Sequence, residues 1–244
     1  MKSIAIAVIA VLSSTAVASA QVQRSDVQKN DVEIEAPDSI TLKGTYFFPG
    51  RPGPAMLLLH QCNMDRHAWD GLAMDLAGAG VHVLTLDFRG FGESGGDRFD
   101  LAQARTIMAE KWPGDVDAAY SYLLSQSGVD RSRVAAGGAS CGVTQSSDLA
   151  ARHSEVKALM LLSGIASESA RSHVMKMTDM AVFGAAAEED TRAADGITAV
   201  VGASKNPAST LKMYGGTEHG VPLFAKHAEL QPVVVAWLST QLGL

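Results

Sequence analysis

Two adjacent nucleophiles, Ser140 and Cys141, stand between glycines in the stretch GGASCG at residues 137–142. A strand-like run precedes this stretch and a helix-like run follows it, so the chain must turn sharply there. A strand–turn–helix of this kind holds its central residue in a strained backbone conformation and needs small residues two positions before and after it. Gly138 and Gly142 meet that requirement around Ser140, whereas a valine stands two positions after Cys141. The pattern predicts Ser140 as the nucleophile.

A serine hydroxyl reacts near neutral pH when a base accepts its proton and a third group orients that base. Where the nucleophile occupies this turn, the chain order is serine, acid, histidine. His219 follows the last predicted strand in YGGTEHG, at the sheet edge where functional groups of parallel sheets collect, and is the expected base. His153 and His227 lie in predicted helices, and His173, a weaker candidate, lies in a short insert.

The acid is expected one loop earlier, where FGAAAEED at residues 183–190 leaves the seventh predicted strand. Glu188, Glu189 and Asp190 all lie there, just before a helix whose dipole also favours negative charge. Asp190 is the expected acid because it stands furthest beyond the strand, next to the helix start. Glu188 is the alternative.

Attack on a carbonyl creates a negatively charged oxygen that needs backbone N–H donors. Cys141, the residue after the nucleophile, is one expected donor. The second is expected in HQCNMD at residues 60–65, from Cys62 or, alternatively, Gln61. Two donors to one oxygen bring their backbones near the Cα separation that a disulfide tolerates. We therefore hypothesise a Cys62–Cys141 disulfide, the alternative being two free thiols that line the pocket.

Alternating strand-like and helix-like segments must position these residues. Two leading strands flank a turn at Pro37, and the six strands that follow are nearly continuous in apolar residues, which is typical of parallel strands buried on both faces. The fold class predicted is α/β, a mostly parallel eight-stranded sheet with helices on both faces. The 16 residues between Ser163 and Met180 leave no room for a large lid. The predicted strands span 31–36, 40–48, 55–60, 81–88, 133–140, 156–163, 180–186 and 209–216, and the predicted helices span 67–79, 115–126, 144–151, 191–201 and 224–242.

The first 20 residues are typical of a secretory signal peptide: Lys2, an apolar run over 4–12 and the small residues of 18–20. The run is too short to cross a bilayer stably, so no membrane insertion is expected after cleavage. Residues 21–244 suit a single domain. The protein is expected to be exported, to the periplasm or the medium, where a disulfide can persist.

The net charge of −6 and the two cysteines exclude several classes of protein. An acidic chain without a basic cluster is not expected to bind nucleic acid. Two cysteines are too few for a disulfide-dense scaffold, and no cluster has the spacing of metal ligands. The expected partner is a small molecule, with no metal or organic cofactor. The sequence does not address the oligomeric state.

Over residues 40–242 the chain resembles the α/β-hydrolase superfamily, and within it the small, lidless dienelactone-hydrolase-like and serine-peptidase-like esterases. Five motifs carry the resemblance, in the family's order: LLLHQCN, LDFRGFGESGG, GASCG, AAAEED and GGTEHG. Two features depart from relatives: His60-Gln61 replaces His-Gly, and Ser140 replaces the cysteine of dienelactone hydrolases. Asp87 and Arg89 in DFRG are expected to be structural, and His60 is expected to pack beneath the oxyanion loop.

The resemblance implies hydrolysis of a carboxylic ester through an acyl-serine intermediate. In that mechanism Ser140 attacks, His219 carries the proton, Asp190 orients His219, and the backbone N–H groups of Cys141 and Cys62 bind the oxyanion. The alternatives are a peptidase or amidase of the same fold and a non-catalytic binding protein that keeps the fold.

Overall fold

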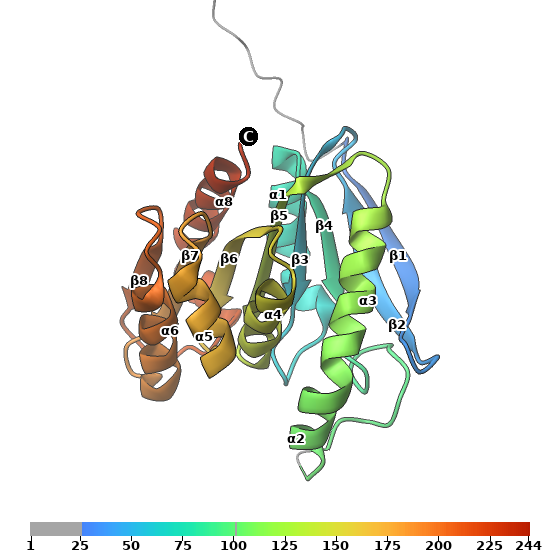
Figure 1. Ribbon diagram of the computed structural model, residues 1–244, viewed down its shortest axis with the longest axis horizontal. Coiled ribbons are helices and arrows are strands. Elements are labelled where there is room, and N and C mark those ends of the chain that lie inside the picture. The colour runs from blue at the N-terminus through green and yellow to red at the C-terminus, as the bar shows by residue number, and fades with distance from the viewer. Residues whose placement is uncertain (1–25, 101) are drawn as a thin grey trace, which may run out of the picture.

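The computed structural model describes residues 26–100 and 102–244, which form one eight-stranded sheet with helices on both faces (Figure 1). The strand order is β1-β2-β4-β3-β5-β6-β7-β8. The antiparallel hairpin of β1 and β2 joins β4, and all neighbours from β4 to β8 pair in parallel. The predicted fold class is confirmed, whereas the predicted signal peptide lies outside the described residues. The strands are β1 (Gln28–Glu35), β2 (Thr41–Phe48), β3 (Gly53–Leu59), β4 (His82–Leu86), β5 (Val129–Ala139), β6 (Val156–Leu162), β7 (Ala181–Ala187) and β8 (Thr210–Tyr214).

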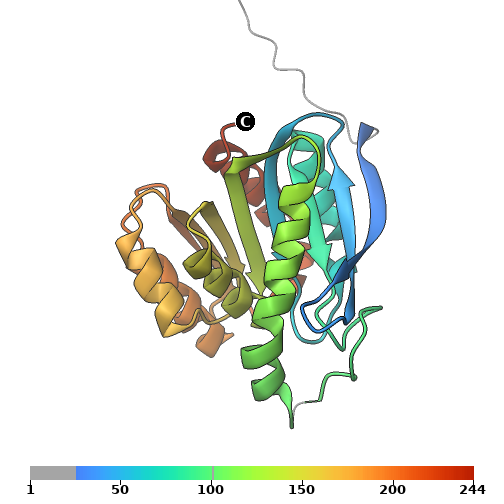
Figure 2. The same cartoon turned by 45° about the vertical axis from the view of Figure 1, so that its right-hand side comes forward.

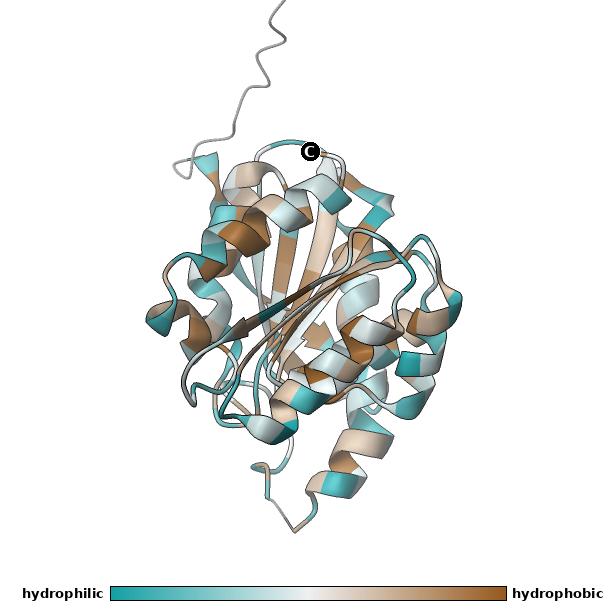
Figure 3. Cartoon of the chain, turned by 90° about the vertical axis from the view of Figure 1, so that its left-hand side faces the viewer, coloured by the Kyte–Doolittle hydropathy of each residue, from teal (hydrophilic) through white to brown (hydrophobic). Residues whose placement is uncertain are grey.

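The central strands are buried because helices cover both faces of the sheet. Every residue of β3, β4 and β7 is buried, as their continuous apolar sequences predict. One core lies between the sheet and the helices α3 (Trp112–Ser125), α4 (Cys141–Arg152), α5 (Glu168–Lys176) and α6 (Thr191–Ala203). The second lies beneath α1 (Asp70–Ala79), α7 (Pro222–Lys226) and α8 (Leu230–Gln241). Figure 2 shows α3 against the sheet, and Figure 3 shows apolar strands between helices whose polar residues face outward.

The two largest errors in the predicted helix boundaries lie next to prolines. The helical segment before Asp115 begins at α2 (Ala104–Thr106) and passes through a π-helical turn, Ile107–Lys111, into α3. Pro113 lacks the N–H that would continue a regular α-helical ladder, and the wider turn accommodates that loss. The predicted helix 224–242 is divided into α7 and α8, which places Pro232 in the first turn of α8, where no N–H is needed.

Between β6 and β7 lies α5, a nine-residue helix that the sequence analysis did not predict. Ser167 begins it by accepting a hydrogen bond from the Ala170 N–H at 3.0 Å. Over the described residues, this insert is too small to form a large lid. The carboxyl ends of β3, β5, β6, β7 and β8 therefore meet at one open edge of the sheet.

Candidate active site

Ser140 stands at the sharp turn between β5 and α4. Its backbone dihedral angles are φ 53° and ψ −116°, a conformation that a non-glycine residue rarely adopts. A Cβ atom on Gly138 would lie 2.2 Å from the Gly142 carbonyl oxygen, and one on Gly142 would lie 2.3 Å from the Leu59 carbonyl oxygen. Both flanking positions thus require glycine, as the spacing around Ser140 indicates.

The structure brings His219 between Ser140 and Asp190. The His219 Nε2 atom lies 2.8 Å from Ser140 Oγ, and its Nδ1 atom lies 2.6 Å from Asp190 Oδ2. An ionised carboxylate only accepts hydrogen bonds, so Nδ1 carries the proton and Nε2 is free to accept one from the serine hydroxyl. His219 comes from the loop after β8, and Asp190 from the turn between β7 and α6.

The two glutamates before Asp190 hold the acid loop against the histidine loop through their backbones. The Glu188 N–H donates to the Tyr214 carbonyl at 2.8 Å, and the Glu189 N–H donates to the Gly216 carbonyl at 3.0 Å. Both residues are exposed. Asp190 occupies the N-cap position of α6 but makes no capping bond with its side chain, because its carboxylate turns toward His219.

A disulfide joins Cys62, in the loop after β3, to Cys141 at the start of α4, with a Cα–Cα distance of 5.9 Å. It connects the two segments from which oxyanion donors are expected. Among the described residues, neither the Cys62 N–H nor the Cys141 N–H donates to a backbone or side-chain acceptor. Of the two residues, Cys141 lines the cavity beside Ser140.

A model of the alpha/beta hydrolase fold family matches residues 54–195, more than half of the chain. The protein belongs to the α/β-hydrolase fold family. Its fold is similar to that of an esterase from Pyrococcus furiosus, with a TM-score of 0.71 and 18% identity over 88% of this chain and 92% of the esterase. It is also similar to P91, a dienelactone hydrolase-like promiscuous phosphotriesterase from metagenomic libraries, with a TM-score of 0.67 and 16% identity over 88% of this chain and 99% of P91.

Two uncharacterized proteins from strains of Mycobacterium tuberculosis are each 35% identical to this α/β-hydrolase over 121 residues, which is 49% of this chain. The matched region spans 40% of the length of each of these relatives.

Gln61 connects the loop after β3 of this α/β-hydrolase to the loop that carries His219. Its side chain is buried; Nε2 donates to Asn63 Oδ1 at 2.8 Å, and Oε1 accepts from the Val221 N–H at 2.8 Å. Gly220, with φ 74°, leaves room for this amide, since a Cβ there would lie 2.2 Å from Gln61 Oε1. Sequence reasoning considered only the backbone of Gln61. The signal for its side-chain role was the replacement of the glycine that many relatives carry.

His60, at the start of the loop after β3, is fully buried against Phe88 and Phe91. Its Nδ1–H donates to the Gln61 carbonyl at 2.8 Å, and its Nε2 accepts from the Phe88 N–H at 3.1 Å. Only the neutral imidazole has one donor and one acceptor. Burial lowers the pKa of His60, which keeps the ring in that neutral form.

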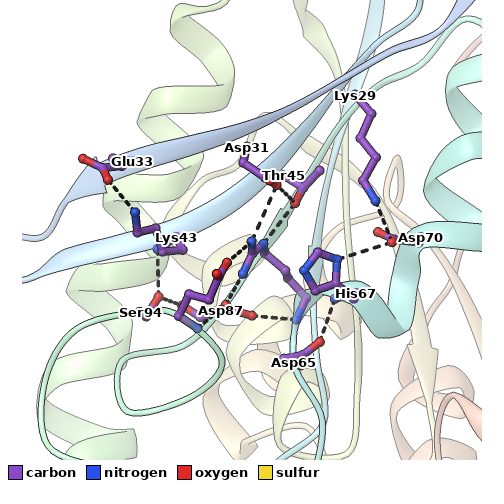
Figure 4. A network of polar contacts seen from close by, with 12 residues as sticks. Lys29, Asp31, Glu33, Lys43, Thr45, Asp65, His67, Asp70, Asp87 and Ser94 are labelled. Atoms are coloured by element: carbon purple, nitrogen blue, oxygen red, sulfur yellow. Dashed lines mark hydrogen bonds and ion pairs between the residues drawn. The ribbon is translucent and has the colours of Figure 1, made fainter.

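Asp87 and Arg89 hold the loop after β4 and take no part in the Ser140 cluster. Asp87 is buried and accepts hydrogen bonds from the backbone N–H groups of Arg66 at 2.7 Å and Glu93 at 3.0 Å (Figure 4). The buried Arg66 guanidinium neutralises Asp87, a role that sequence reasoning missed. Arg89 donates to the buried Asp115 carboxylate at 2.6 Å.

A cavity of about 460 Å³ opens beside Ser140 and His219. Its wall includes Gly164, Ile165 and Ala166, which follow β6. Over the residues that the structure describes, no group of three or more histidine, cysteine or acidic side chains could hold a metal ion. In the same part of the chain, none of the helices has the length and apolar character needed to span a membrane.

Proposed function

We propose that this protein is a serine hydrolase that cleaves carboxylic esters through an acyl-serine intermediate. The observation that carries the proposal is the position of His219, whose two ring nitrogens contact Ser140 Oγ and Asp190 Oδ2 at 2.8 and 2.6 Å. This arrangement provides a nucleophile, a base and an orienting carboxylate in contact.

In the proposed reaction, Ser140 Oγ attacks the ester carbonyl carbon while His219 Nε2 accepts the hydroxyl proton. The carbonyl oxygen becomes an oxyanion, which accepts hydrogen bonds from the N–H groups of Cys141 and Cys62. The intermediate collapses, the bond to the alcohol oxygen breaks, and the leaving alkoxide takes the proton from His219. Water then attacks the acyl-serine with His219 again as the base, which releases the acid and restores Ser140. Asp190 stabilises the imidazolium at each step.

A fluorophosphonate probe tests the nucleophile, because it reacts covalently with an activated serine. We expect the wild-type protein to be labelled and Ser140→Ala to remain unlabelled. Ser239→Ala serves as the control, since its hydroxyl lies on α8 and bonds the Val235 carbonyl. On p-nitrophenyl acetate, Ser140→Ala is expected to lower kcat by roughly 10⁴-fold or more. Persistent labelling of Ser140→Ala would show that another residue is the nucleophile.

A substrate screen tests the bond that is cleaved. We expect turnover of p-nitrophenyl esters and little turnover of aminoacyl p-nitroanilides, because an alkoxide or phenoxide leaves more readily than an amine anion. Efficient anilide cleavage would indicate a peptidase. A chain that is not labelled by the probe and turns over neither class would be a binding protein with this fold.

We also propose that residues 1–20 direct export and are removed. The Cys62–Cys141 disulfide supports this proposal, since disulfides persist mainly in oxidising compartments. Expression of the full chain with fractionation of cells and medium tests it. We expect the exported protein to begin at Gln21 by intact mass. A cytosolic product that retains residue 1 would contradict the proposal.

A further inference from the structure

The cavity beside Ser140 is lined by both apolar residues and an arginine. Besides Ser140 and His219, its lining includes small and aliphatic residues, among them Gly164, Ile165 and Ala193. Arg192, two residues beyond Asp190 in the first turn of α6, lines the same cavity. A bound molecule can therefore contact the nucleophile and this guanidinium together.

A second cavity of about 520 Å³ continues the first and adds another arginine. The two cavities share Ile165, Ala166 and Arg192 in their walls. Arg171, from α5, lines the second cavity together with Arg192 and Asp195 of α6. The two cavities together form a cleft, called here the arginine cleft, that leads from Ser140 to Arg192 and Arg171.

Neither arginine of the cleft forms an ion pair within the described part of the chain, although Asp195 also lines the second cavity. Glu168 precedes Arg171 by three residues and Asp195 follows Arg192 by three, a spacing at which helical residues can pair. No ion pair forms in either case, and neither guanidinium donates to another described residue. Other arginines of the protein, such as Arg66, Arg89 and Arg152, pair with carboxylates.

The first turn of α6 adds to the positive character of the cleft. Asp190 stands at the N-cap position of α6, but its carboxylate contacts His219, so the helix begins without a side-chain cap. The partial positive charge at a helix start favours an anion. Arg192 at this helix start supplies a full charge with planar donors that match a carboxylate.

Resting on the proposed function, we propose that the substrates of this site are esters that carry a carboxylate, which binds Arg192 and Arg171. The apolar wall formed by Ile165, Ala166 and Ala193 accommodates a short aliphatic segment between the ester and the carboxylate. A singly charged anion fits this cleft better than a dianionic phosphate, because Asp190 and Asp195 also line it.

Paired substrates measure the preference for charge at equal chain length. On the acyl side, p-nitrophenyl hydrogen adipate is compared with p-nitrophenyl hexanoate. On the alcohol side, 4-carboxyphenyl acetate is compared with 4-carbamoylphenyl acetate. We expect the carboxylate substrate of at least one pair to have the higher kcat/KM, by about tenfold, with the pair identifying the part of the ester that occupies the arginine cleft. The ratio should fall as NaCl is raised from 0.05 to 0.5 M, as salt screens exposed charges.

Arg192→Gln and Arg171→Gln test which arginine binds the substrate carboxylate. Arg192→Gln is expected to reduce the ratio of the two kcat/KM values about tenfold, toward one, and Arg171→Gln to reduce it by a smaller factor. Arg131→Gln is the matched control, because Arg131 is exposed at the start of β5 and donates to the Leu124 carbonyl. That control should keep the wild-type ratio.

Binding without turnover provides a second readout. In a Ser140→Ala background, isothermal titration with p-nitrophenyl hydrogen adipate should give a Kd that rises about tenfold when Arg192→Gln is added. Ester turnover without a carboxylate preference, or a preference and affinity that survive Arg192→Gln and Arg171→Gln, would overturn the inference while leaving the proposed function standing. Absence of turnover on every ester would overturn the proposed function, and this inference with it.

Discussion

Removal of the Cys62–Cys141 disulfide is expected to lower both stability and turnover. The two cysteines are 79 residues apart in sequence. In the chain-entropy model, a crosslink across a loop of that length lowers the conformational entropy of the unfolded chain. The folded state is thereby stabilised by about 4.5 kcal/mol at 25 °C. The Cys62→Ala/Cys141→Ala double variant should therefore lose about 3–4 kcal/mol of unfolding free energy, allowing for residual structure in the unfolded state.

The effect on turnover follows from the backbone groups beside the two sulfurs. Loss of one oxyanion donor costs about 10²–10³ in kcat. The double variant retains both N–H groups but no longer holds their segments 5.9 Å apart, so we expect a smaller decrease in kcat, of about tenfold. KM should change by less than about twofold, because the proposed donors would act mainly on the charge that develops in the transition state.

Urea denaturation at 25 °C compares the oxidised wild type, the reduced wild type and the double variant, and p-nitrophenyl acetate reports kcat and KM below the unfolding transition. Reduction of the wild type serves as the control for the substitutions themselves. Intact mass after alkylation counts the free thiols. Two freely alkylated thiols in exported, unreduced protein would refute the disulfide. An unchanged kcat in a less stable double variant would refute its role at the oxyanion site.

Three further predictions concern the surrounding segments. Gly142→Ala should destabilise the fold by about 1–3 kcal/mol and abolish most activity, because the new Cβ would lie 2.3 Å from a β3 carbonyl oxygen. A Gly142→Ala variant with the melting temperature and kinetics of the wild type would contradict the turn geometry. Gln61→Met removes the acceptor of the Val221 N–H, so kcat should fall about tenfold with KM nearly unchanged, and Gln61→Glu, which keeps an acceptor, should recover part of the loss. An equal loss in both variants would exclude positioning through this bond. Burial lowers the pKa of His60 below its ordinary 6.5, so on acidification the unfolded chain binds a proton at this ring before the folded protein does. The free energy of unfolding should therefore fall below pH 6.5, by up to about 1.4 kcal/mol per pH unit until the pKa of the folded state is reached. In His60→Gln, urea titrations between pH 8 and 5 should show a shallower fall, and an unchanged slope would exclude His60 as a source.

Local chemistry made the strands and the nucleophile turn predictable. The continuous apolar sequences of β3 and β7 favour strands that are buried on both faces of a sheet. The steric limits around Ser140 depend on residues only two positions away. The helix boundaries near Pro113 and Pro232 were harder to predict, because each proline is tolerated in a first turn and the sequence does not mark where that turn begins.

Interactions between distant segments were harder still. Glu188, Glu189 and Asp190 are adjacent and all carry a carboxylate. Only the orientation of the turn into α6 places Asp190 against His219, while the other two residues bond to the histidine loop through their backbone N–H groups. The partner of the Gln61 amide lies 160 residues away in sequence. No local pattern could show that pairing.

By itself, the sequence determined the order of the strands and the residue at the centre of the nucleophile turn, because hydrophobic periodicity and steric exclusion act over a few neighbouring positions. Only the tertiary structure decided which acidic residue meets the imidazole, that the two sulfurs join, and that Arg171 and Arg192 line one cleft without forming an ion pair. Those features depend on how separate loops converge at the sheet edge, where distance in space, rather than distance along the chain, sets the energy of each contact.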